Sequence, residues 1–151
     1  MTKDVLLAIK GLQFDASQEE SDIQTITAAK YYKKNNSHYV IYDEAIEGTD
    51  QTTKNMIKFK EKTLELTKKG IINVHMIFEE NKKCLTNYAT PFGDILIGID
   101  AKKITMRDED KTIYVNVDYT LDVNYEFLAD CKISMKISER EAGINGIFDR
   151  I

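Results

Sequence analysis

His75 is the residue best suited by type to acid–base chemistry, because an imidazole exchanges its proton near neutral pH. Glu79 follows four residues later and offers a carboxylate partner. The sequence has no Gly-x-Ser-x-Gly elbow and no second histidine at metal-ligand spacing, and a lone histidine is more often structural. His38, directly after Asn35–Ser37, is typical of a turn residue. We therefore predict no catalytic residue, and an enzyme built on His75 and Glu79 is the last of three hypotheses.

Two groups of carboxylates carry weaker signals. Asp118 and Asp122 share one face of a predicted strand and could flank a substrate, but the wet outer face of a sheet has the same pattern. The run Asp108–Asp110 lacks the spaced ligands and the glycine of a calcium loop, which favours a polar hairpin tip. No dinucleotide, Walker, zincin or Cys-x-x-Cys motif is present. We predict neither a metal site nor a cofactor.

The clearest structural element is the segment 113–123, which has apolar residues at every odd position. These are Ile113, Val115, Val117, Tyr119, Leu121 and Val123. Alternation with period two is typical of a long strand with one wet face. Cys131–Ile137 alternates in the same way, so the C-terminal third predicts two neighbouring antiparallel strands with a shared interior.

The rest of the chain divides into short runs that end at Asn, Gly, Asp or double-Lys positions. The expected strands are Val5–Phe14, Ile23–Lys33, His38–Ile46, Thr52–Lys60, Thr63–Lys68, Ile71–Glu79, Lys82–Thr90, Asp94–Asp100, Lys103–Arg107 with Lys111–Asn124, and Asp130–Ser138. Short connections and the absence of a long helical pattern predict an all-β fold, a single antiparallel up-and-down β-barrel of about 8–10 strands. A two-sheet sandwich is the weaker alternative.

Composition sets broad limits on function. The 151 residues suffice for one domain, and 42% hydrophobic with 30% charged residues is typical of a globular protein. A net charge of −4 argues against nucleic acid as a partner. No apolar run is long enough to span a bilayer, so we expect no membrane role. Without a signal-like start, the expected location is the cytoplasm, where Cys84 and Cys131 would be free thiols.

The last residues change in character. Ile144, Ile147, Phe148 and Ile151 have the spacing of one helical stripe. We therefore divide the chain into a barrel domain, residues 1–138, and a tail, residues 139–151, that packs on the barrel or serves in association.

Two segments carry a family resemblance. Lys68–Phe78 and Tyr88–Leu96, the latter with the run Tyr-Ala-Thr-Pro-Phe-Gly, resemble the YwiB-like family of small bacterial proteins. The resemblance covers roughly residues 3 to 138 and implies a calycin-like, lipocalin-like barrel, without an established activity. In the family pattern an arginine precedes the turn glycine, and this chain has Lys68, which cannot replace arginine at a bidentate anion site.

The turn after Tyr88 has a physical interpretation of its own. Pro91 cannot donate to a ladder and Gly93 permits a positive φ, so the segment is expected to form a corner at a barrel mouth. The candidate ligand-binding residues are Tyr88, Thr90, Phe92, His75 and Lys68.

The leading hypothesis is a barrel that binds a small apolar or amphipathic ligand in its lumen without catalysis. A lumen filled by Ile, Leu, Phe and Met side chains would argue against it. The alternative is a side-chain-filled barrel that acts as a protein-interaction or scaffold module, in the form of a homodimer, through an outer sheet face or the tail.

Overall fold

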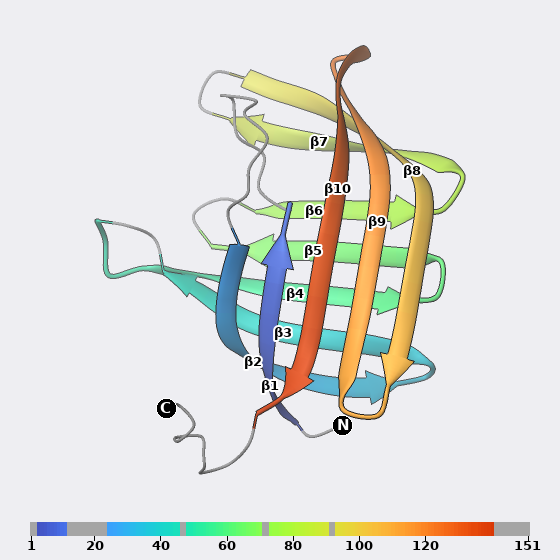
Figure 1. Ribbon diagram of the computed structural model, residues 1–151. Helices are drawn as coiled ribbons and strands as arrows, with labels where there is room; N and C mark the ends of the chain where they lie inside the picture. The colour runs from blue at the N-terminus through green and yellow to red at the C-terminus, as the bar shows by residue number, and fades with distance from the viewer. Residues whose placement is uncertain (1–2, 12–23, 46–47, 71–72, 91–92, 141–151) are drawn as a thin grey trace.

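The computed structural model describes residues 3–11, 24–45, 48–70, 73–90 and 93–140, which form an all-β fold (Figure 1). The described strands are β1 (Asp4–Lys10), β2 (Gln24–Lys34), β3 (Ser37–Ala45), β4 (Thr52–Lys60), β5 (Thr63–Lys69), β6 (Val74–Glu79), β7 (Lys82–Thr90), β8 (Gly93–Glu109), β9 (Thr112–Val123) and β10 (Glu126–Glu139). The described segments contain no helix long and apolar enough to cross a membrane.

The ten strands close into a barrel in which each strand is antiparallel to its neighbours in the chain. β10 returns to β1, where Leu7 lies opposite Ile137. This arrangement confirms the predicted up-and-down barrel, and closure removes the exposed sheet edges that an open meander would have.

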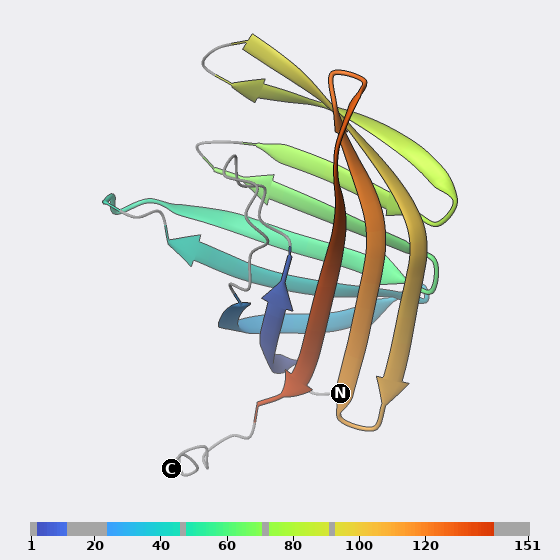
Figure 2. The same ribbon diagram turned by 45° about the horizontal axis from the view of Figure 1, so that its top comes forward.

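The barrel is flattened into two layers whose strands cross (Figures 1 and 2). β3–β6 run across the direction of β1, β9 and β10, and the long strands β2 and β8 bend from one layer into the other. In β2, pairing with β1 ends at Lys30, the residue at which pairing with β3 begins. Bent strands of this kind form the corners of orthogonally packed sheets.

β8 differs from the prediction of two separate pieces. It is one strand with a bulge between Ala101 and Lys103. The bulge inserts an extra residue, so the buried positions change from odd (Ile99, Ala101) to even (Ile104). A continuous strand therefore shows a broken alternation in its sequence.

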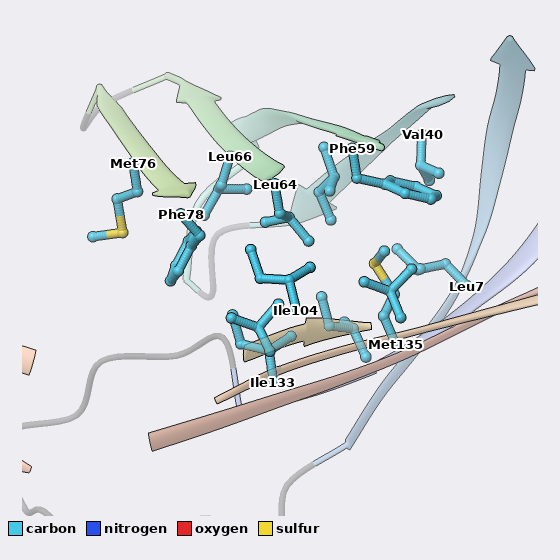
Figure 3. Close-up of a cluster of buried hydrophobic side chains, with 14 of the residues drawn as sticks. Leu7, Val40, Phe59, Leu64, Leu66, Met76, Phe78, Ile104, Ile133 and Met135 are labelled. Carbon is cyan, nitrogen blue, oxygen red and sulfur yellow. The ribbon is translucent and has the colours of Figure 1, made fainter. Parts of the chain in front are cut away.

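The centre of the barrel is filled by apolar side chains from both layers (Figure 3). Phe59 and Leu64 approach from one wall, and Ile104 and Ile133 from the other. All four have at most 1% of their surface accessible to water, either outside or in an interior cavity. The predicted inward positions of β9 and β10 contribute to this core, from Ile113 to Leu121 and from Ile133 to Ile137. The lumen is therefore filled by side chains, and this finding argues against a ligand in the middle of the barrel.

The ladder is interrupted between β6 and β7. These strands pair only at Glu79 and Lys82, and beyond this point the Thr86 hydroxyl donates to the His75 carbonyl at 3.1 Å. At the connecting turn, the Glu80 carboxylate accepts the backbone N–H of Ile104 at 2.9 Å, which satisfies a donor freed by the β8 bulge. β7 and the first half of β8 thus turn away from β6 (Figures 1 and 2).

The end of β10 lies beside the start of the chain. The strand continues through Glu139, and the backbone N–H of Arg140 donates to the Asp4 carbonyl at 3.2 Å. The predicted apolar stripe, in residues 141–151, lies outside the described residues. Both cysteines are free thiols.

Candidate functional site

A row of polar side chains crosses the inner face of the sheet at one end of the barrel. Tyr42 of β3 lies opposite Asn55 of β4, and Asn55 lies opposite Lys68 of β5. β3 and β5 end at this side of the barrel, on the left in Figure 1, and β4 begins there. We call Tyr42, Glu44, Thr53, Asn55 and Lys68 the polar cluster.

Strand alternation accounts for the inward direction of these residues. On each of the three strands, the residue two positions away from the row is completely or almost completely buried. These residues are Val40, Ile57 and Leu66. Side chains two positions apart share a face of a strand, so the polar row lies directly on the apolar core. Its inner boundary is closed to water.

Asn55 is the centre of the hydrogen bonding. Its Nδ2 donates to Glu44 Oε1 at 3.3 Å and to the Thr53 carbonyl at 3.4 Å, and Lys68 Nζ donates to the same Glu44 oxygen at 3.1 Å. Because both neighbours of Nδ2 are acceptors, the orientation of the amide is determined. Asn55 itself is 0% exposed.

The other atom of the amide has no hydrogen-bond partner among the described residues. Among the described residues, Asn55 Oδ1 is the buried side-chain oxygen without a hydrogen bond. An unsatisfied buried acceptor costs about 1–3 kcal/mol, and such groups are rare in native proteins without a structural or functional reason.

Tyr42 supplies a neutral hydroxyl to this end of the barrel. Burial, with the nearby negative charge of Glu44, raises the pKa of the Tyr42 phenol to about 12. The phenol therefore keeps its proton at neutral pH and serves as a hydrogen-bonding group.

Gly70 packs closely against Thr53 of the polar cluster. A Cβ at this position would lie 3.0 Å from Thr53 Oγ1 and 3.2 Å from Thr53 Cα. The chain that leaves β5 can thus pack directly on the start of β4, and the Gly70 N–H donates to Asn73 Oδ1 at 3.1 Å.

The comparisons place this barrel in a family. A family model described as "Domain of unknown function (DUF1934)" matches residues 7–135. The chain belongs to the DUF1934 family. No curated protein matches it in sequence. The crystal structure of the ywiB protein from Bacillus subtilis is similar, with a TM-score of 0.73 and 17% identity over 92% of this chain and 93% of that one. The predicted YwiB-like resemblance is confirmed, and at this identity the likeness shows the fold alone.

Of the residues predicted to bind a ligand, Lys68, Tyr88 and Thr90 lie on two strands of this DUF1934 member that end at the same side of the barrel. Lys68 belongs to the polar cluster. Tyr88 is half-buried against the core near the end of β7, and Thr90 is the last residue of that strand. β5 and β7 end at the same side of the barrel (Figure 1). Phe92 lies outside the described residues.

His75 lies on the opposite face of the sheet from Lys68. Its side chain is 53% exposed, and its Nε2 lies 2.7 Å from Glu65 Oε2 on β5. Glu79 instead approaches Lys82 at 3.9 Å. Residues four apart on a strand are about 13 Å apart, so the structure does not bring His75 and Glu79 together.

The carboxylates of β9 lie on the outer face. Asp122 pairs with Lys83, and Asp118 lies 3.8 Å from Lys132. The run Asp108–Asp110 forms the end of the β8–β9 hairpin, as predicted. Within the described residues, no three His, Cys, Asp or Glu side chains gather as a metal site would require.

Sequence reasoning did not single out Asn55, Glu44 or Thr53. The alternation of β4 could have revealed Asn55, because this residue stands at one of the alternate positions that face the core, together with Ile57 and Phe59. A polar residue at an apolar phase position marks a buried polar group that needs a partner.

Proposed function

We propose that the protein binds a small polar molecule at the polar cluster and performs no chemistry on it. The observation that carries the proposal is the buried, unpartnered Asn55 Oδ1. Because Asn55 is 0% exposed, a ligand reaches this oxygen only when neighbouring side chains of the mouth move aside. A hydrogen bond donated to the oxygen would then offset the cost of burying it. The expected site thus moves from the middle of the lumen, which is packed, to one mouth of the barrel.

The groups of the cluster are suited to binding. Glu44 and Lys68 form an ion pair at 3.1 Å, and Tyr42 keeps its proton. Neither a free base nor an activated nucleophile results from this arrangement. Calycin-like barrels such as lipocalins hold one small ligand inside the barrel, and the packed lumen of this protein leaves the mouth for such a ligand. We expect the protein to act in the cytoplasm.

The proposal is tested by native mass spectrometry of freshly purified protein against its denatured mass. The parent chain should carry an adduct that unfolding releases, and Asn55→Leu should lose it. Asn116→Leu, at an exposed position on the outer face of β9, is the matched control and should keep the adduct. An adduct that persists in Asn55→Leu, or a parent chain without one, argues against the site.

A second candidate function, a protein-interaction module, is favoured by one outer surface. Leu85, Tyr125, Phe127 and Leu128 are 53%, 76%, 64% and 40% exposed. Clustered exposed aromatic residues are typical of interaction surfaces. We call these four residues the apolar tip.

Pairing across four strands places Phe127 and Leu85 in one row, with Asp122 and Gly98 between them. Phe127 lies opposite Asp122, and Asp122 lies opposite Gly98, which lies opposite Leu85. Gly98 has no side chain, so Leu85 extends across it toward Asp122. A bulge between Phe127 and Ala129 leaves Leu128 unpaired beside this row.

The occupant that we propose for the apolar tip is a second copy of the chain. Its central charges, Lys83 and Asp122, form an ion pair, so two copies related by a two-fold axis can exchange these partners without repulsion. Phe127→Ser should convert a dimer to a monomer in sedimentation analysis. Ile26→Ser, at a position 62% exposed on β2, should not. A monomeric parent chain argues against this function.

A further inference from the structure

We propose that the molecule bound at the polar cluster is a zwitterion, with a protonated amine at Asn55 and an anionic group at Lys68. This inference rests on the proposed function and deepens it. It follows from the acceptors and donors that the described contacts leave unfilled.

The unfilled acceptors lie at Asn55 and Glu44. Within the part of the chain that the structure describes, Asn55 Oδ1 has no partner and the bonds of Glu44 all use Oε1. Asn55 Nδ2 is 3.3 Å from that carboxylate, and Oδ1 shares a carbon atom with Nδ2. The amide that carries Oδ1 therefore lies beside a negative charge. Charge-assisted hydrogen bonds are about twice as strong as neutral ones, so this position favours a protonated amine over a hydroxyl.

The unfilled donors lie at Lys68. Its ammonium group has three N–H bonds, and the described contacts use one of them, on Glu44. The Lys68 side chain is 26% exposed, so the group is open to a ligand but partly shielded from water. An anionic oxygen of the ligand is the acceptor best suited to the remaining N–H bonds of this ammonium group.

The balance of charge argues against ligands with one charge. Glu44 and Lys68 neutralise each other across 3.1 Å. A simple cation at Asn55 would leave the remaining donors of Lys68 unfilled, and a simple anion at Lys68 would leave Asn55 Oδ1 without a donor. A compact zwitterion satisfies both sides and adds no net charge to a partly buried site.

The test is an NMR titration of the ¹⁵N-labelled full chain, observed at the Asn55 side-chain amide. The probes are glycine, methylammonium, acetate and glycerol, which are a zwitterion, a cation, an anion and a neutral polyol. Glycine should bind at least about 10-fold more tightly than each of the others, the difference expected for one charged hydrogen bond.

Variants separate the two halves of the ligand. Lys68→Met should weaken glycine binding by roughly 10- to 100-fold and bring its affinity close to that of methylammonium. Lys69→Met removes the next, exposed lysine of β5 and should leave both affinities unchanged. A purely structural role for Lys68 would not alter the ratio between the two probes.

The outcomes distinguish this inference from the proposed function. Equal binding of glycerol or methylammonium and glycine overturns the zwitterion and leaves a polar binding site. A copurified adduct that lacks either charge has the same meaning. Both proposals fail if the parent chain carries no adduct, no probe shifts the Asn55 signals and Oδ1 binds only an ordered water.

Discussion

The sheet formed by β3–β6 buries polar side chains at both of its ends. Among the described residues, the hydrogen bonding is complete at one end and incomplete at the other. At the end next to the β2–β3 turn, the Tyr31 hydroxyl and His38 Nδ1 form a hydrogen bond of 2.7 Å. His38 stacks on Phe59 with ring centroids 4.9 Å apart. At the other end, Asn55 Oδ1 has no partner among the described residues. A completed polar pair stabilises the fold, whereas an incomplete one is suited to a molecule from outside.

This difference corrects the interpretation of His38. The residue is the second of β3 and is 2% exposed, so it belongs to the interior and not to the turn. The turn is formed by Asn35 and Asn36, which have positive φ angles of 53° and 67°. Asparagine tolerates this left-handed region better than most residues.

The largest expected effect is that of His38→Ala. The change leaves the Tyr31 hydroxyl without its partner and opens a cavity beside Phe59, so the free energy of unfolding should fall by about 2–4 kcal/mol. Urea denaturation measures this loss. Because the residue belongs to the satisfied end, binding at the polar cluster should be unchanged in the folded variant. A loss below about 1 kcal/mol would mean that this end is not structurally important.

Asn55→Leu should have a smaller effect of opposite sign. Leucine has the same branching and the same number of side-chain heavy atoms and removes the unpartnered acceptor, while Glu44 keeps its contact with Lys68. Without ligand, the free energy of unfolding should rise by about 1 kcal/mol. Thermal denaturation of the ligand-free parent and variant measures this gain. A destabilisation as large as that of His38→Ala would show that Asn55 is needed by the fold itself.

The smallest expected effect is a dependence of stability on pH. Burial, with the positive charge of Lys33, lowers the pKa of His38 below its ordinary value of 6.5, and Asp108 acts in the opposite direction. The unfolded chain then binds the proton more tightly than the folded chain. Stability is fully present above pH 6.5 and is lost as the pH falls through the folded-state pKa.

His38→Gln supplies the control for the pH experiment, because glutamine can still bond to Tyr31 but does not titrate. Its free energy of unfolding should be flat just below pH 6.5, where that of the parent falls. The lowered pKa values of Glu80 and Asp4 act with the same sign, but from ordinary values of 4.5 and 3.8. If the free energy of unfolding fell equally with pH in the parent and in His38→Gln just below pH 6.5, this result would contradict a buried, neutral His38.

Much of the fold was predictable because its signals are local. Alternation in β9 predicted the buried face from Ile113 to Leu121, and the expected strands agree with most observed bounds. The failure at β8 has a local cause, since one bulge residue reverses the phase between Ala101 and Ile104. The polar cluster was less predictable, and of its members only Lys68 was named as a candidate.

The sequence by itself determined the strands, their inward faces and the closed meander, because period-two patterns and short turns act within a few residues. Only the tertiary structure decided which polar groups meet. Asn55 and Glu44 are eleven residues apart, and Lys68 and Glu44 are twenty-four apart, yet all meet through strand register. His75 meets Glu65 and not its sequence neighbour Glu79 for the same reason. Register and packing, which a single strand does not specify, place the unpartnered oxygen at one mouth of a filled barrel.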